Sequence, residues 1–230
     1  MLMHIPGVLS ADQVHAMRAR LSAAGDAWVD GRATAGHQGA QVKRNLQVAE
    51  DSSIAQELGA IVLASLGRAP LFLSAALPAV IYPPLFNRYE SAGAMRFGMH
   101  VDGAVRLMPG TGARIRTDLS ATLFLTEPAD YDGGELTIES PAGTQAIRLP
   151  AGDLLLYPAT TMHAVTPVTR GVRLASFFWV QSLVRDAAQR ALLFDLDMAV
   201  IRLTKASPAH PSVIALTGCY HNLLRMWAEP

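Results

Sequence analysis

The sequence predicts a mainly β fold of the sandwich or jelly-roll type with flanking helices. From residue 71 to residue 181, short runs rich in Val, Ile, Leu, Phe and Thr alternate with Pro and Gly, a pattern typical of short strands separated by turns. About eight strands with turns roughly every 8–12 residues favour this fold over a parallel α/β sheet. The expected strands are residues 71–77, 80–89, 119–126, 135–139, 145–149, 153–157, 163–168 and 173–181.

Two helices are expected before these strands. Ser10 and Gln13 form a capping-box signature, which is followed by apolar residues at helical spacing as far as Gly25. A second capping-box signature, Ser53 and Gln56, opens a similar apolar stretch. Between the two helices we expect short strands at residues 27–30 and 41–48 around a Gly-rich loop at residues 31–39.

After residue 181 the pattern becomes helical again. Helical spacing of apolar residues is found in segments 184–201 and 211–227, and Ser207 with Pro208 breaks the pattern between them. Such a hairpin must pack on the β core or on a second subunit, so it could form a homodimer surface. The expected domains are N-terminal helices with supporting strands at 1–77, a β core at 78–182 and a C-terminal helical extension at 183–230.

Composition restricts the classes of function. Of the 230 residues, 50% are hydrophobic, which is enough for a buried core. Lys plus Arg and Asp plus Glu both number 19, so no net charge favours binding to nucleic acid or to a membrane surface. Cys219 is the single cysteine, and the sequence shows neither a secretory signal nor an apolar run of membrane-spanning length. We therefore expect a cytoplasmic protein.

Three residues suggest a metal site. His100 and Asp102 are two positions apart, so on a strand or at its end both side chains point to one face. This triplet alone is weak evidence, because short motifs often match by chance. His163 begins a later expected strand and supplies a third ligand. Two imidazoles and one carboxylate form a three-point metal site that leaves half of an octahedron open.

Arg173 adds a second feature to this site. It follows His163 by ten residues across an expected turn at Arg170-Gly171, and should therefore lie on the adjacent antiparallel strand. Alternation places Arg173, Phe177 and Trp179 on one face of that strand. A buried guanidinium is costly unless it meets an anion, and a carboxylate matches its planar fork best. A metal site beside such an arginine predicts a ligand that carries a carboxylate.

The combination resembles the iron(II)- and 2-oxoglutarate-dependent dioxygenases, which fold as a double-stranded β-helix (jelly roll). More narrowly, the chain is similar to the bacterial PKHD-type hydroxylases of the PiuC iron-uptake-factor kind, over nearly its whole length. The segments that carry the resemblance are FNRY at 86–89, HVDGAVR at 100–106, DGGEL at 132–136 and HAVTPVTRG at 163–171.

The resemblance implies a role for each of these residues. His100, Asp102 and His163 would be the catalytic metal ligands for Fe(2+), and Arg173 would bind the distal carboxylate of the co-substrate 2-oxoglutarate. L-ascorbate would keep the iron reduced. The reaction would hydroxylate an unactivated C–H bond with O2 and release succinate and CO2. The β core at 78–182 would be the dioxygenase unit.

The resemblance also implies a lining for the co-substrate pocket. Tyr89 matches a tyrosine that hydrogen-bonds the co-substrate in related prolyl hydroxylases, and Trp179 matches an aromatic residue of the same pocket. Phe124 stands where a related prolyl hydroxylase has a second tyrosine. Because phenylalanine has no hydroxyl, the hydrogen bonds of the pocket should differ here.

Two other functions remain open at this point. One is a cupin-like metalloprotein that does not use 2-oxoglutarate, in which Arg173 is structural. The other is an iron-sensing or iron-holding protein that is not an enzyme. The sequence does not select a peptidyl substrate over a small molecule. Three arginines that follow the triplet could contact an acidic substrate: Arg106, Arg114 and Arg116.

Overall fold

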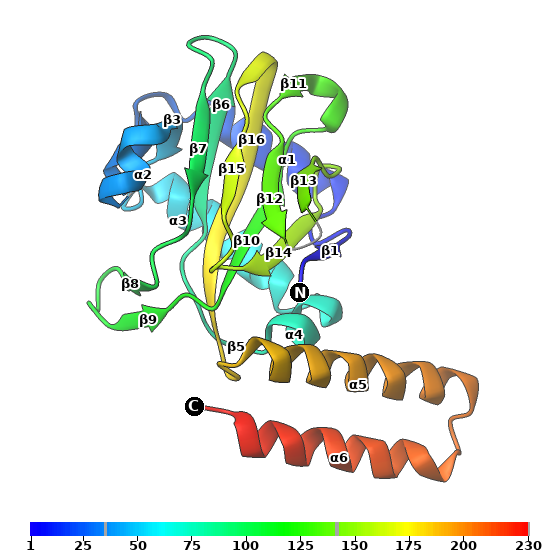
Figure 1. The fold of residues 1–230 in the computed structure, drawn as a ribbon. Coiled ribbons are helices and arrows are strands. Elements are labelled where there is room, and N and C mark those ends of the chain that lie inside the picture. Colours follow the sequence, from blue (N-terminus) through cyan, green and yellow to red (C-terminus); the bar gives the residue numbers. More distant parts are fainter. Residues whose placement is uncertain (35, 141–142, 230) are drawn as a thin grey trace.

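Two antiparallel sheets form the core of the computed structural model, which describes residues 1–34, 36–140 and 143–229 (Figure 1). The larger sheet has the strand order β1-β14-β10-β16-β6-β4-β2, and β11 and β5 also pair with β16. Its strands are β1 (Met3–Ile5), β2 (Trp28–Asp30), β4 (Leu46–Val48), β5 (Pro78–Ile81), β6 (Leu85–Glu90), β10 (Leu119–Phe124), β11 (Tyr131–Gly133), β14 (Leu154–Pro158) and β16 (Val168–Ser182).

The smaller sheet has the order β13-β12-β15-β7-β3. Its strands are β3 (Lys43–Arg44), β7 (Arg96–His100), β12 (Leu136–Ser140), β13 (Gly143–Ile147) and β15 (His163–Val165). A separate ribbon pairs β8 (Val105–Leu107) with β9 (Arg114–Arg116). Buried side chains of both sheets pack in one cluster, with Tyr89 and Phe124 from the larger sheet and Leu136 and Val165 from the smaller one. The predicted jelly roll is confirmed.

Helices cover the outer face of the larger sheet. The helices α1 (Ala11–Ser22), α3 (Ser53–Leu66) and α4 (Pro70–Ala76) contribute Met17, Leu58 and Phe72 to the main hydrophobic cluster. The ring of Phe72 meets that of Phe178 on β16 edge to face, at 6.5 Å between centroids. Successive side chains of a strand point to opposite faces of the sheet. Phe177, which precedes Phe178 in β16, therefore faces the space between the two sheets. Shorter helical segments are η1 (Gly25–Ala27), η2 (Gly31–Thr34), α2 (His37–Val42) and η3 (Pro128–Asp130).

A helical hairpin formed by α5 (Ala187–Ala206) and α6 (Pro211–Trp227) extends from one end of the sandwich (Figure 1). Tyr220 and Trp227 of α6 pack against a small cluster that includes Leu193 of α5 and Leu77. No residue of α6 is buried, and Ile214 is 82% exposed. In the described residues no single helix is long and apolar enough to cross a membrane, although α3 and α4, bent by 88°, pass that test as a pair.

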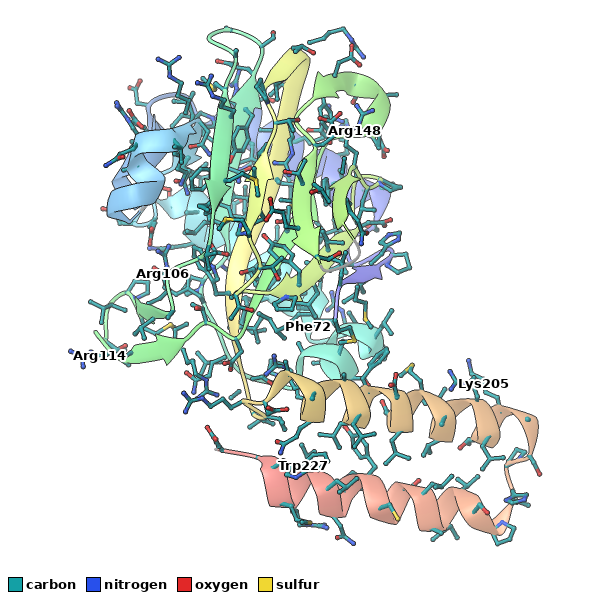
Figure 2. All side chains as sticks on the ribbon, viewed as in Figure 1. Phe72, Arg106, Arg114, Arg148, Lys205 and Trp227 are labelled. Atoms are coloured by element: carbon teal, nitrogen blue, oxygen red, sulfur yellow. The ribbon has the colours of Figure 1, made fainter. Side chains whose placement is uncertain are left out.

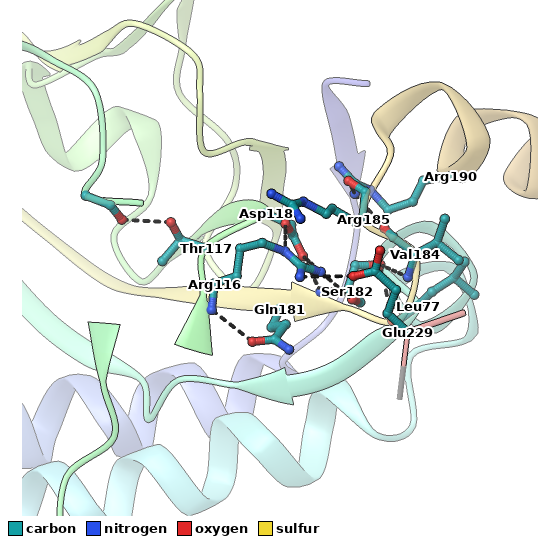
Figure 3. Close-up of polar contacts among 11 residues, drawn as sticks. Leu77, Arg116, Thr117, Asp118, Gln181, Ser182, Val184, Arg185, Arg190 and Glu229 are labelled. Carbon is teal, nitrogen blue, oxygen red and sulfur yellow. Dashed lines mark hydrogen bonds and ion pairs between the residues drawn. The ribbon is translucent and has the colours of Figure 1, made fainter. Parts of the chain in front are cut away.

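A polar network attaches the base of this hairpin to the larger sheet (Figure 3). The guanidinium of Arg116 bonds to the Asp118 carboxylate at 2.7 Å and to Glu229, near the end of the chain, at 3.3 Å. Asp118 also accepts a hydrogen bond from the backbone N–H of Ser182 at 2.9 Å. Arg190 of α5 donates to the Val184 carbonyl at 2.7 Å. The start of β10 and the C-terminal segment are therefore held together.

The two ends of the chain follow the sequence prediction closely. At α1 the Ser10 hydroxyl accepts from the Gln13 backbone N–H, and the Gln13 side chain accepts from the Ser10 N–H, which completes the capping box. The helix predicted at 211–227 matches α6, and the helix predicted at 184–201 corresponds to α5, which begins three residues later and continues to Ala206. The second capping box is wrong, because the N-cap of α3 is Ser52, whose hydroxyl accepts from the Ala55 N–H.

Other expected elements differ from the structure. The strand predicted at residues 71–77 is helix α4, since Pro70 at its first turn presets a helical φ and Leu77 ends it with φ 43°. The loop predicted at 31–39 contains η2 and the start of α2, and the strand predicted at 41–48 begins at Lys43. The strand predicted at 80–89 is divided into β5 and β6 at Pro83-Pro84, because proline cannot donate to a ladder.

The predicted turn at Arg170-Gly171 is also wrong. Strand β16 runs through both residues, and Tyr131 pairs with Gly171. The chain instead changes sheets between Val165 and Val168, so β15 and β16 belong to different sheets. His163 and Arg173 therefore face each other across the sandwich rather than along neighbouring strands.

A candidate metal centre between the two sheets

Three side chains converge at one end of β7 and β15, two neighbouring inner strands of the smaller sheet. His100 ends β7, His163 begins β15, and the two residues are direct partners in the antiparallel ladder. Asp102 follows β7 by two residues and returns toward both rings. Its carboxylate oxygens lie 3.9 Å from His100 Nε2 and 3.7 Å from His163 Nε2. One ligand atom from each residue lies within 4.8 Å of the others, so this group could hold a metal ion.

Backbone carbonyls orient both imidazoles. His100 Nδ1 lies 2.8 Å from the Gly98 carbonyl, and His163 Nδ1 lies 2.9 Å from the Thr161 carbonyl. An oxygen acceptor requires Nδ1 to carry the proton, which leaves the Nε2 lone pair directed to the centre. Burial and the nearby His163 lower the pKa of His100 to about 4, so its ring is neutral at pH 7 as metal binding requires.

A residue of the larger sheet orients the Asp102 carboxylate. Ser120 of β10 donates a hydrogen bond from its hydroxyl to Asp102 Oδ2 at 2.6 Å. Three positions earlier, Thr117 donates to the Gly103 carbonyl at 2.7 Å and so fixes the loop beside Asp102. Hydrogen bonds of this kind orient a ligand before the metal arrives.

Arg173 lies in the same cavity of about 350 Å³ as the triad. It is 1% exposed, and its guanidinium carbon lies 5.5 Å from the ring centre of Tyr89 and 5.3 Å from that of Phe124. Its Nε and Nη1 have no hydrogen-bond partner among the described residues. A buried cation with unpartnered donors fits an anionic ligand, and this is the second feature that the sequence predicts.

The other predicted pocket residues also lie at the cavity or behind it. Tyr89 pairs directly with Arg173 on the neighbouring strand, and burial raises the pKa of its hydroxyl to about 12. Trp179 lines the cavity, and its Nε1 has no hydrogen-bond partner in the described part of the chain. Phe124 does not line the cavity but packs against the Arg173 guanidinium from behind.

The three arginines after the triplet have different surroundings. Arg106 stacks on the Trp179 ring, 3.8 Å from its centre. Arg114 lies at the outer edge of the β8–β9 ribbon (Figure 2). Arg116 is directed to Asp118 and Glu229. Of the three, Arg106 therefore lies against a residue of the cavity wall.

Sequence reasoning did not identify four residues that line the cavity or support the triad. Ser120 lines the cavity and bonds to Asp102, and the Tyr157 ring lies 5.2 Å from that of His163. Lys43 and Asn87 are buried polar residues of the wall. For Lys43 the sequence offered one signal, which is the polar residue at every second position from Lys43 to Gln47. This pattern equally suits a strand with one face exposed to solvent.

Comparison with known proteins first identifies the general class. The model of the 2OG-Fe(II) oxygenase superfamily matches residues 84–181. A Pseudomonas putida prolyl-4-hydroxylase has a similar fold, with a TM-score of 0.52 and 20% identity over 79% of this chain and 92% of that chain. A Trichoplax adhaerens prolyl hydroxylase gives a TM-score of 0.57 and 16% identity over 83% and 86%. Fold and site thus define a 2-oxoglutarate-dependent oxygenase of the jelly-roll type.

The relatives then define the family. The model of the PKHD-type hydroxylase C-terminal domain matches residues 187–229. A PKHD-type hydroxylase of Burkholderia ambifaria is 64% identical over 229 residues, which span 100% of both chains. The chain belongs to the PKHD-type hydroxylases and is a 2-oxoglutarate-dependent dioxygenase.

Proposed function

We propose that the protein hydroxylates an unactivated C–H bond while it converts 2-oxoglutarate and O2 into succinate and CO2. The observation that carries this proposal is one cavity that contains both the triad and the unpartnered nitrogens of Arg173. One atom of O2 enters succinate and the other enters the product. The electrons for this reduction come from 2-oxoglutarate and from the C–H bond, so no further reductant is consumed in the coupled reaction.

His100, Asp102 and His163 would hold Fe(2+), because two imidazoles and a carboxylate suit this ion and leave positions open for other ligands. Bound iron would supply the redox chemistry that couples oxidation of 2-oxoglutarate to hydroxylation. The protein contributes neutral imidazoles fixed by backbone carbonyls and a carboxylate oriented by Ser120. We assign L-ascorbate as the reductant that restores Fe(2+) after uncoupled turnover.

Arg173 would bind the distal carboxylate of 2-oxoglutarate through its Nε and Nη1. Tyr89 supports this role, because its ring packs on the guanidinium and its raised pKa keeps the hydroxyl protonated as a donor. The indole N–H of Trp179 is a second donor in the cavity wall. With Phe177 beside it, Trp179 would also limit the access of water.

Anaerobic addition of Fe(2+) and 2-oxoglutarate tests this function. The expected result is a weak metal-to-ligand charge-transfer band in the visible spectrum. Absence of the band in protein shown to contain iron would contradict the proposal. It would mean that 2-oxoglutarate does not bind the metal at this site, as in the cupin-like or iron-holding alternatives that the sequence alone left open.

We also propose a cytoplasmic location and a homodimer. One exposed cysteine, Cys219, suits a reducing compartment. Exposed apolar side chains of the C-terminal hairpin, among them Leu192, Ile214 and Met226, would contribute to a dimer contact. Light scattering of the purified protein measures the oligomeric state, and a monomer over the working concentration range would exclude this contact.

A further inference from the structure

The connection between β11 and β12 lies against the side chain of Arg173. A Cβ atom added at Gly134 would stand 3.1 Å from Arg173 Cδ and 3.2 Å from Tyr131 Cε2. It would also stand 2.9 Å from Val168 Cγ2. These distances are shorter than ordinary van der Waals contact, so any side chain at this position would displace its close-packed neighbours. The close approach of this backbone to Arg173 therefore depends on glycine, which also adopts the φ of 62° found at Gly134 without strain.

Tyr131 is the second residue of this connection that lies beside Arg173. It pairs with Gly171, two positions before Arg173 on β16, so the side chains of Tyr131 and Arg173 are diagonal neighbours on one face of the sheet. Both residues are buried. Burial raises the pKa of the Tyr131 hydroxyl, and the charge of Arg173 is the strongest influence that lowers it. The hydroxyl oxygen has no hydrogen-bond partner in the described residues, so it can accept an N–H of the guanidinium beside it.

Hydrogen bonds hold both residues of the connection in place. The Gly134 N–H donates to the carbonyl of Pro167, which lies in the crossover between β15 and β16, at 3.3 Å. The Arg148 guanidinium donates to the Tyr131 carbonyl at 3.0 Å, and its central carbon lies 5.6 Å from the Tyr131 ring centre (Figure 2). The connection therefore cannot move away from Arg173 without breaking these contacts.

The side chain of Arg173 is thus enclosed by neighbours that fix where its guanidinium lies. Besides Tyr131 and Gly134, the rings of Tyr89 and Phe124 pack on the guanidinium. A guanidinium has several N–H groups, so one can bond to Tyr131 while Nε and Nη1 remain for a ligand. This position matters because the chain of 2-oxoglutarate sets how far its distal carboxylate lies from the end that reaches the metal. A misplacement of about 1 Å can lower catalysis by about a hundredfold.

We propose that Gly134 and Tyr131 are positioning residues that fix the reach of Arg173, and so make the site select a 2-oxo acid with a second carboxylate at the end of its chain. Gly134 brings the backbone against the aliphatic part of Arg173, and the Tyr131 hydroxyl orients the guanidinium. This inference rests on the proposed function, because it requires Arg173 to bind the distal carboxylate.

A pair of ligands separates the positioning of Arg173 from the general integrity of the site. 2-Oxoglutarate and 2-oxovalerate have the same metal-binding end and a chain of the same length, but 2-oxovalerate carries a methyl group in place of the distal carboxylate. Each is titrated anaerobically into protein loaded with Fe(2+), and the Kd is taken from the charge-transfer band. The ratio of the two Kd values measures the preference for the distal carboxylate.

Gly134→Ala should lower this preference by about tenfold or more, because the new Cβ displaces the Arg173 side chain. The Kd for 2-oxovalerate should stay within about twofold of wild type. Gly7→Ala is the matched control, since Gly7 has a φ of 63° and a Cβ there would meet no atom within 4 Å. It introduces similar backbone strain without displacing a neighbour, so both Kd values should be unchanged.

Tyr131→Phe removes the hydroxyl and keeps the ring, and it should lower the preference by about fivefold. This variant decides the question if Gly134→Ala does not fold. An unchanged preference in either variant that binds Fe(2+), or an equal loss of affinity for both ligands, would overturn the proposal. If wild-type protein gave no band with 2-oxoglutarate, the proposed function itself would fail, so the two failures are distinguishable.

Discussion

Replacement of Lys43 with methionine should change how stability depends on pH. Burial, followed by the charge of Arg106, lowers the pKa of Lys43 from 10.5 to about 8. Each pKa unit corresponds to about 1.36 kcal/mol, so this difference represents about 3 kcal/mol. The folded protein loses the Lys43 proton near pH 8, whereas the unfolded chain keeps it until about pH 10.5.

The sign of the effect follows from these two pKa values. Below pH 8 Lys43 is protonated in both the folded protein and the unfolded chain, and the folded protein carries the full cost of the buried charge. As pH rises from 8 toward 10.5 the unfolded chain binds more protons than the folded one, so the free energy of unfolding increases. Methionine has no such proton. The stability of wild type minus that of Lys43→Met should therefore rise with pH by about 3 kcal/mol.

Urea unfolding of both metal-free proteins at several pH values from 7 to 10 measures this difference. Titration of other groups affects both proteins and cancels in the comparison. Most of the change should appear within this range. A difference that stays constant to within about 0.5 kcal/mol, which is the size of an ordinary surface effect, would falsify the assignment of Lys43 as a buried cation.

Three further predictions concern the triad and Arg173. Ser120→Ala should lower the affinity for metal by about 10–100-fold, because Asp102 loses the hydrogen bond that orients it. Calorimetry with Zn(2+) measures this affinity. An unchanged affinity would show that Ser120 does not support the metal site. Arg173→Ala should weaken 2-oxoglutarate binding by about 2–5 kcal/mol in the charge-transfer titration and leave metal affinity nearly intact. If both are lost together, Arg173 is needed for folding instead. His163→Ala should abolish substrate-independent succinate production, and an unchanged rate would exclude His163 as a ligand.

The convergence of the candidate metal ligands was predictable in part because two of them are neighbours in the sequence. His100 and Asp102 are two residues apart, and the loop that turns Asp102 toward His163 needs no long-range information beyond the ladder pairing of the two histidines. The presence of a buried Arg173 beside the triad could also be predicted, although the predicted geometry was wrong. The sequence does not reveal that the chain crosses to the other sheet before β16.

Two other differences have physical causes that a single sequence does not reveal. The apolar run at residues 71–77 is short enough to suit either a buried strand or a helix, and packing of Phe72 on Phe178 stabilises the helix. Lys43, Asn45 and Gln47 have the spacing of a strand with one face in water. Only the strands that cover them, which are distant in sequence, make that face an interior wall.

The arrangement of the triad also has a mechanical consequence. Both histidines belong to the smaller sheet, whereas Asp102 is tied through Ser120 to the larger one. An ion bound by these side chains would act as a cross-link between the two halves of the sandwich. A ligand that binds only the folded state adds to its stability, by about 2.7 kcal/mol at a hundredfold excess over Kd. The supply of iron would therefore set the free energy of unfolding of the chain as well as its activity.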